Sequence, residues 1–273
     1  MSVTINGKNY RVADAHAHIY PHKIADKATA SVGNFYDIPM DLIGCSETLL
    51  DHGRQAGTER YLVCSVATKP EQVQSINRFI AGECEQHPEF IGLAAFHKDV
   101  EDYEKEVGLI CESGFKGVKL HPDFQRFNID DPQIIPFYRL CAERGLVVLF
   151  HTGDKRYDFS TPRRLLNAKD KVPELKCIAA HFGGYSVWET AFRELRGQDV
   201  YFDTSSSLDF IDKDFAVEMI RGYGADKMMY GTDFPMWDPV EELRRFINLD
   251  LTEEENKKIL YDNFASLFGI DKQ

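Results

Sequence analysis

The sequence lacks the features that mark secreted, membrane-bound or nucleic-acid-binding proteins. No apolar run in its 273 residues approaches the length of a membrane span, and the N-terminus has no signal-peptide pattern. Lysine and arginine form no basic stripe, and the formal net charge is −12. Phosphate binding needs clustered positive charge, so this balance argues against a general nucleic-acid binder. We therefore predict a protein that binds neither a membrane nor nucleic acid.

Cysteine pairs of the CxxC type are also absent, although the chain has six cysteines. Two of them, Cys64 and Cys177, lie inside apolar runs that resemble strands. In a chain of this length without a secretory signal, buried free thiols are more common than a disulfide framework. We therefore expect free thiols and a cytoplasmic location.

No linker rich in proline, glycine or serine divides the chain, and no glycine-rich phosphate loop follows the first predicted strand. Short apolar runs that end in polar residues predict eight strands, at 10–19, 61–68, 90–98, 115–122, 146–153, 175–184, 200–207 and 228–235. Helical patterns lie between them, at 70–88, 99–114, 131–145, 186–197, 209–224 and 252–269.

Strands that alternate with helices indicate a parallel sheet, and eight repeats in this length fit a (β/α)₈ TIM barrel. We predict one such domain over residues 1–273. A doubly wound open sheet is the competing fold, but it would be favoured by the phosphate loop that is missing. Residues 20–45 look irregular and form an extended loop after the first strand. Its 31–40 portion is expected to be a substrate lid or recognition loop, or else a surface insertion without function.

The first strand carries the sequence VADAHAHIY. Residues at i, i+2 and i+4 of a strand face the same side, so Asp14, His16 and His18 share one face. Two surface histidines on an edge strand would explain this pair alone. However, the other strands also end in polar residues, and five of the nine histidines lie at strand ends. The polar residues at the predicted strand ends are His16, His18, Lys119, His121, His151, His181, Asp203, Ser205, Ser206, Ser207 and Asp233.

In TIM barrels the active site lies at the carboxyl ends of the strands. Imidazole and carboxylate groups gathered there suit Zn²⁺ and similar divalent ions, which lower the pKa of bound water to about 7. We expect His181 to polarise a substrate oxygen or relay a proton, and Asp233 to bind metal and accept a proton. His151 could instead be a buried core histidine, and Asp233 could only cap a turn.

With these motifs in place, the chain resembles the amidohydrolase superfamily over essentially its whole length. The resemblance is to the amidohydrolase-related (amidohydrolase 2) branch, which includes aminocarboxymuconate-semialdehyde decarboxylase. Its marks, in chain order, are DAHAH at 14–18, KLHP at 119–122, FHTG at 150–153, AHFGG at 180–184 and GTDFP at 231–235.

The resemblance implies a TIM barrel with one divalent ion, Zn²⁺ or alternatively Mn²⁺. It implies four metal ligands, His16, His18, His151 and Asp233, and a catalytic role for His181. Self-association, as a dimer, is expected by the same analogy. Some members of the superfamily hold two metals through a carboxylated lysine, and Lys119, His151 and His181 could fill those roles.

With one metal, we expect Lys119 and His121 to bind an anionic group on a small-molecule substrate, such as a carboxylate. The main prediction for the reaction is hydrolysis of a small carboxylate-bearing amide, ester or lactone by metal-activated water. The alternative is metal-dependent, non-oxidative decarboxylation of an unsaturated or aromatic carboxylic acid. A purely structural metal site is a third reading, but structural sites are usually closed by four ligands that often include cysteine.

Overall fold

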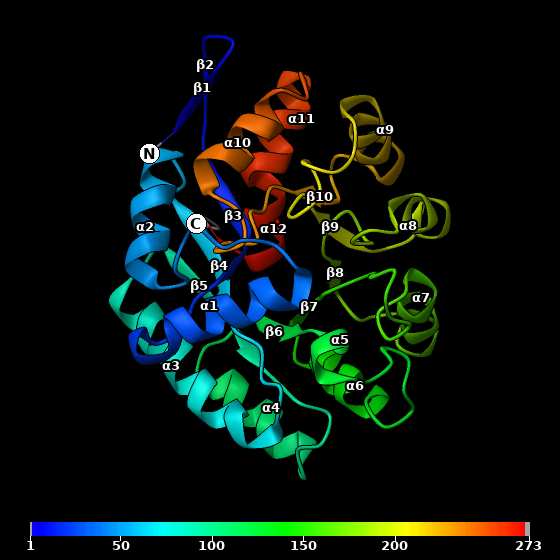
Figure 1. Cartoon of the computed structure of the whole chain (residues 1–273). Coiled ribbons are helices and arrows are strands. Elements are labelled where there is room, and N and C mark those ends of the chain that lie inside the picture. The colour runs from blue at the N-terminus through cyan, green and yellow to red at the C-terminus, as the bar shows by residue number, and fades with distance from the viewer. Residues whose placement is uncertain (1, 271–273) are drawn as a thin grey trace. The chain divides into compact units, whose positions relative to one another are not determined.

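A computed structural model describes residues 2–270 (Figure 1). The chain contains two compact units. The first unit combines the chain up to Val63 with the chain from Asp203 onward, and the second unit is Cys64–Phe202. Both units alternate strands with helices, as the sequence pattern predicts. That residues 1–273 form a single domain stays a prediction.

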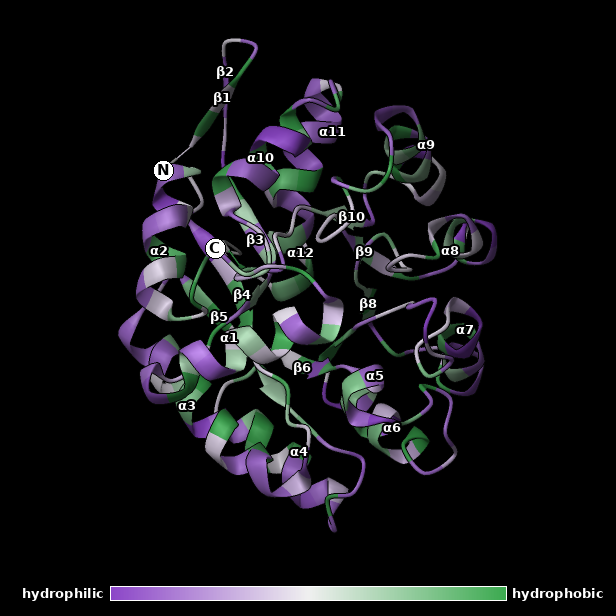
Figure 2. Ribbon diagram, viewed as in Figure 1, coloured by the Kyte–Doolittle hydropathy of each residue, from purple (hydrophilic) through white to green (hydrophobic). Residues whose placement is uncertain are grey.

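The second unit contains the middle strands of the chain. Its strands are β5 (Phe90–Ala95), β6 (Gly117–Leu120), β7 (Val147–Phe150), β8 (Cys177–Ala179) and β9 (Tyr201–Asp203), of which Asp203 belongs to the first unit. Its helices are the short η1 (Pro70–Gln72), α3 (Val73–Gln86), α4 (Tyr103–Glu112), α5 (Pro122–Gln125), α6 (Ile135–Glu143), α7 (Pro162–Lys171) and α8 (Trp188–Leu195). The helices are amphipathic, and in Figure 2 α4 carries both hydrophobic and hydrophilic residues.

The strands of the second unit pair in parallel and in chain order, from β5 to β9. Every residue of β6, β7 and β8 is buried. Continuous apolar burial of this kind is typical of parallel strands that are covered on both faces. The side chain of Asn77 on α3 bonds to both the N–H and the C=O of Ala95, and so it fixes α3 to the end of β5.

The first unit is built from both ends of the chain. Its N-terminal elements are β1 (Val3–Ile5), β2 (Lys8–Tyr10), β3 (Ala13–His18), α1 (His22–Tyr36), α2 (Ser46–Gln55) and β4 (Arg60–Cys64), whose last residue lies in the second unit. Its C-terminal elements are α9 (Lys213–Tyr223), β10 (Met228–Met229), α10 (Pro239–Ile247), α11 (Glu253–Lys257), the π-helical turn η2 (Lys258–Asp262) and α12 (Asn263–Phe268).

Strand β3 and the segment at β10 are joined by backbone hydrogen bonds. The N–H of Ala15 donates to the C=O of Tyr230 at 2.9 Å, and that of His18 donates to Phe234 at 2.7 Å. The Asp14 carboxylate accepts bonds from the N–H and hydroxyl groups of Thr232. Burial nevertheless raises the pKa of Asp14 to about 7. Asp14 therefore connects β3 to the segment that follows β10.

The predicted strands and helices lie where the sequence pattern places them, but most are shorter. Of the polar residues at the predicted strand ends, His16, His18, Lys119 and Asp203 lie within their strands, and the others lie in the loops that follow. The long segment after β3 is present, although it is not all irregular, because residues 22–36 form helix α1. The β1–β2 hairpin was not predicted, since its two strands of three residues are too short to give an alternating pattern.

All six cysteines are free, as predicted, and four of them are buried. Burial raises the pKa of the half-buried Cys84 thiol to about 12, so this thiol is unreactive at neutral pH. Within residues 2–270, no helix combines the length and the apolar character that crossing a membrane requires.

A buried glutamate on α10 gives the first testable prediction, which concerns stability. Arg245 donates to Oε1 of Glu242. The other carboxylate oxygen of Glu242, Oε2, is buried and has no hydrogen-bond partner within residues 2–270. Burial outweighs Arg245 and raises the pKa of Glu242 to about 7. The folded state therefore binds this proton more tightly than the unfolded state, and the wild type loses stability as the pH rises from about 4 to about 7.

Glutamine at this position cannot titrate. We expect the free energy of unfolding of Glu242→Gln to rise relative to wild type by up to about 3 kcal/mol over that pH window. Urea unfolding between pH 4 and pH 8 measures this difference. Glu241→Gln, on the exposed side of α10, controls for the loss of one charge from the helix. A difference between Glu242→Gln and wild type that is the same at every pH would contradict the prediction.

Candidate active site

Three predicted metal ligands of the first unit lie together. The Nε2 atoms of His16 and His18, both at the end of β3, are 3.2 Å apart. The Oδ1 atom of Asp233, which follows β10, lies 3.4 Å from Nε2 of His16 and 3.3 Å from Nε2 of His18. His16 is fully buried, and the side chains of His18 and Asp233 are 12% exposed. We call these three residues the metal triad, after the role that the sequence predicts for them.

Two side chains from the end of β9 orient His16. Its Nδ1 lies 3.1 Å from Oδ2 of Asp203 and 3.1 Å from Oγ of Ser205. Ser205 donates its own proton to Oδ1 of Asp203. The Nδ1 atom of His16 is therefore the donor, which leaves the lone pair of Nε2 facing the rest of the metal triad. Metal-binding histidines usually donate their second nitrogen to a carboxylate in this way.

The spacing of the metal triad fits a divalent ion. Ligands bonded at about 2.0–2.1 Å in a tetrahedron lie about 3.4 Å from one another, close to the three separations here. Without a cation, the Nε2 lone pair of the buried His16 would face Oδ1 of Asp233 at 3.4 Å. Imidazole and carboxylate ligands suit Zn²⁺ and Mn²⁺, and they leave open positions for substrate. The residues present therefore fit the implied metal.

Several residues at the predicted site have a left-handed backbone. Asp233 has φ of 60° and Ser206 has φ of 49° in the first unit, and His181 has φ of 61° and Phe182 has φ of 53° in the second. Residues other than glycine rarely adopt this region, and they cost free energy when they do. Such backbone strain gathers at functional sites, because the surrounding structure must hold the side chains in place.

The second unit brings three predicted site histidines together. Nδ1 of His151 lies 3.0 Å from Nε2 of His181, and the rings of His121 and His151 stack with centroids 3.9 Å apart. This approach depends on glycine in both motifs, FHTG and AHFGG. A Cβ atom on Gly153 would lie only 2.6 Å from the Cα atom of Gly184. The two motifs therefore need glycine where the loops after β7 and β8 meet.

Asp123 completes this histidine cluster. Its Oδ2 accepts a hydrogen bond from Ser160 and lies 3.6 Å from Nε2 of His151. Its Oδ1 is buried and has no hydrogen-bond partner within residues 2–270. Burial raises the pKa of Asp123 to about 7. Together with His121 and His151, Asp123 forms a second group of buried ligand atoms, which lie within 4.8 Å of one another.

Lys119, on β6, is buried, with 1% of its surface exposed. A buried ammonium group is costly unless anionic or polar groups surround it. His121, directly after β6, is held by its own turn, because Nδ1 accepts a hydrogen bond from the N–H of Phe124 at 3.3 Å. Both predicted substrate-binding residues therefore lie at the end of the same strand.

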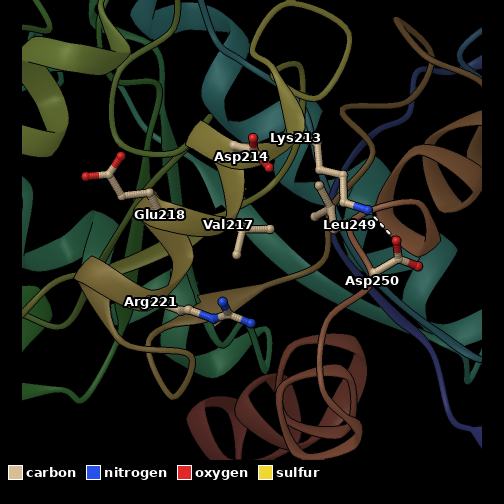
Figure 3. Close-up of a pocket in the computed structure, with 7 residues that line it drawn as sticks. All are labelled: Lys213, Asp214, Val217, Glu218, Arg221, Leu249 and Asp250. Carbon is tan, nitrogen blue, oxygen red and sulfur yellow. Dashed lines mark hydrogen bonds and ion pairs between the residues drawn. The ribbon is translucent and has the colours of Figure 1, made fainter.

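A charged groove on the first unit contains none of the predicted site residues (Figure 3). It lies beside α9 and the loop that follows α10. It is lined by Lys213, Asp214, Val217, Glu218, Arg221, Leu249 and Asp250. Lys213 pairs with Asp250, and Arg221 pairs with Glu255. Exposed ion pairs of this kind contribute little free energy, so the groove has the properties of an ordinary charged surface.

Sequence reasoning did not assign roles to the groups that hold the metal triad and the histidine cluster. Asp203 and Ser205 were noticed only as polar residues at a strand end. Asp123, Ser160 and Trp237 were not singled out. Hydrogen bonds between residues far apart in the chain leave no periodic signal, so a single sequence could not identify these partners.

Comparison with known proteins supports the resemblance. The family model described as Amidohydrolase matches residues 13–270. Gamma-resorcylate decarboxylase of Polaromonas sp. (strain JS666 / ATCC BAA-500) is 26% identical over 120 residues. That match covers 38% of this chain and only 37% of the length of the relative.

Solved structures show the fold. An uncharacterised TIM-barrel protein from Bordetella bronchiseptica has a TM-score of 0.77 at 18% identity, with 95% of this chain and 98% of that chain covered. A 5-carboxyvanillate decarboxylase from Novosphingobium aromaticivorans, solved with manganese and 4-hydroxy-3-methoxy-5-nitrobenzoic acid, has a TM-score of 0.77 at 17% identity over 96% of both chains. The predicted TIM barrel is therefore confirmed.

The main prediction for the reaction is wrong. The relatives with named activities are mostly decarboxylases of aromatic carboxylic acids, including dihydroxybenzoate and 5-carboxyvanillate decarboxylases. One putative 2-pyrone-4,6-dicarboxylic acid hydrolase has the same fold. These named activities favour decarboxylation, the alternative prediction, over hydrolysis. The sequence could not separate the two reactions, because one metal ion and one acid–base group would serve either of them.

The prediction of an amidohydrolase-superfamily enzyme is confirmed. The family model covers nearly all of the residues that the structure describes. It also spans every motif on which the resemblance depends, from DAHAH to GTDFP. The chain belongs to the amidohydrolase family.

Proposed function

We propose that the protein is a metal-dependent, non-oxidative decarboxylase of a small aromatic carboxylic acid. The observation that carries the proposal is the metal triad, in which His16, His18 and Asp233 present three ligand atoms at the mutual spacing of a metal shell. The named activities of the relatives supply the reaction class.

We propose that each chain holds one divalent ion, Mn²⁺ or Zn²⁺, through the metal triad, with His151 as the fourth ligand that the family resemblance implies. When bound, the ion would hold oxygens of the substrate and withdraw negative charge from them. Asp203 and Ser205 would keep the lone pair of His16 directed at the ion. Two tightly bound ions per chain would contradict this proposal and would favour a carboxylated Lys119.

The other predicted residues would act on the substrate. Lys119 and His121 would bind its carboxylate through charge and hydrogen bonding. His181 would deliver a proton to the ring carbon that carries the carboxylate. The bond from this carbon to the carboxylate then breaks, its electron pair returns to the ring, and CO₂ leaves. His151, 3.0 Å from His181, would hold the ring of His181 in position.

The experiment supplies the metal-loaded protein with 2,6-dihydroxybenzoate or 5-carboxyvanillate and measures CO₂ and the aromatic product. We expect release of CO₂ from at least one of them, loss of the reaction after chelation, and recovery on addition of Mn²⁺ or Zn²⁺. A 2-pyrone-4,6-dicarboxylate sample is the comparison for ring opening by water. Unchanged rates after chelation, or ring opening of the pyrone with no CO₂ from either aromatic acid, would contradict the proposal.

Self-association, as a dimer, and a cytoplasmic location remain predictions. Light scattering of the purified chain tests the first, because a dimer would have twice the 31.2 kDa mass of the chain.

A further inference from the structure

We propose that Ser206 and Trp237 are positioning residues that fix the Asp233 carboxylate for metal binding. The inference rests on the proposed metal site and adds two residues to it. Ser206 lies in the turn after β9, and Trp237 lies just before α10. All three residues belong to the first unit.

The direction of the hydrogen bonds is fixed by the chemistry of the partners. The Nε1–H group of Trp237 can only donate, and it lies 2.8 Å from Oγ of Ser206. The serine oxygen therefore accepts this bond, and its own single proton is left to donate. Oδ2 of Asp233 lies 2.6 Å from Oγ of Ser206, whereas the sulfur of Met236, a weak acceptor, lies 3.7 Å away. The proton of Ser206 therefore points to Asp233.

These hydrogen bonds give the two oxygens of Asp233 different partners. A distance of 2.6 Å is typical of a hydroxyl that donates to an ionised carboxylate. With Oδ2 held by Ser206, rotation of the carboxylate is restricted. Oδ1 then stays beside the Nε2 atoms of His16 and His18, at 3.4 and 3.3 Å. Ser206 would therefore orient Asp233, as Asp203 and Ser205 orient His16.

The backbone of Ser206 shows that this placement is not the most stable one for a serine. Its φ of 49° is left-handed, a region that glycine occupies without steric cost. Ser206 is also buried, with 2% of its surface exposed. The hydrogen bonds of the Ser206 hydroxyl with Asp233 and Trp237 therefore offset a backbone cost that glycine would not have.

Ser206→Gly separates the two roles, because it removes the hydroxyl and relieves the backbone strain. We expect this variant to remain folded, because relief of the backbone strain offsets part of the loss of the two hydrogen bonds. Its Kd for Mn²⁺, measured by calorimetry on the full chain, should rise by about 10- to 100-fold. Trp237→Phe should raise the Kd by a smaller factor, because Ser206 can still donate to Asp233. Ser207→Ala is the matched control, because its hydroxyl donates to the C=O of Ser205 and not to Asp233.

A spectroscopic signal tests the connection itself. The chain has two tryptophans, so Trp188→Phe leaves Trp237 as the single indole. Addition of Zn²⁺, which has no absorbance of its own, should change Trp237 emission in this background. The change should disappear when Ser206→Gly is added, even at Zn²⁺ concentrations that saturate the site. A purely structural role for Ser206 would leave the emission change intact.

The outcomes distinguish this inference from the proposed function. If the wild type binds no Mn²⁺, the proposed metal site fails. If the wild type binds Mn²⁺ and Ser206→Gly binds it with the same Kd, the metal site stands and the positioning role is overturned. A weaker Kd in Ser206→Gly together with an unchanged Kd in Ser207→Ala supports the role of Ser206.

Discussion

Asp233→Asn should lose bound metal and lower the decarboxylation rate by at least about 10³-fold. The substitution keeps the size of the side chain but removes the negative charge that faces His16 and His18. A neutral amide oxygen is a much weaker ligand for Mn²⁺ or Zn²⁺ than a carboxylate. The fold should be retained, because asparagine tolerates the left-handed backbone that Asp233 adopts, with φ of 60°.

The measurements are metal content after dialysis, CO₂ release and thermal unfolding. Asp250→Asn is a closely matched control, because Asp250 also has a left-handed backbone, with φ of 53°. Its side chain is 76% exposed and pairs with Lys213 on the surface. We expect this control to retain metal and activity. A folded Asp233→Asn protein with wild-type metal content and rate would remove Asp233 from both of its proposed roles.

His181→Asn should retain metal and still lose activity, by about 10²- to 10⁴-fold, because the proton donor to the ring carbon is removed. Asparagine is again the suitable replacement, since His181 has φ of 61°. The test compares metal content with the rate of CO₂ release at saturating substrate. Retention of metal with loss of rate would place His181 in the chemistry and not in the metal shell.

The control for this variant is His87→Asn, which changes a half-buried histidine that pairs with Glu83 at the end of α3. Its rate should match that of wild type. A wild-type rate in His181→Asn would contradict the proton-donor role. Loss of metal in His181→Asn would indicate instead that His181 is a ligand, as a two-metal site requires.

The sequence predicted the elements that carry strong local patterns. Apolar runs such as LVVLF located the buried strands, and HxH with GTDFP pointed to three residues whose side chains lie together in the structure. Helix α1 was missed because residues 20–45 were interpreted as one irregular segment, although residues 22–36 form a helix. The main prediction for the reaction was wrong for a different reason: one metal ion and one acid–base group can serve either hydrolysis or decarboxylation, and residue types alone do not show which one takes place.

The hydrogen-bond partners of the site residues could not be predicted from a single sequence. Ser206 stands in a run of three serines, and nothing in that run distinguishes the one that contacts Asp233. Trp237 follows GTDFP closely, yet its indole could have faced either way. Only the folded structure shows that its N–H donates to Ser206.

The first unit joins the two ends of the chain, and this has a consequence for biosynthesis. His16 and His18 are synthesised before the second unit, whereas Asp233 follows only after the whole second unit has been made. A nascent chain therefore cannot bring these three side chains together until the second unit has been synthesised. Under the proposed metal site, metal binding would come after the segment that carries Asp233 has paired with β3, and the ion would then link two segments that are far apart in the sequence.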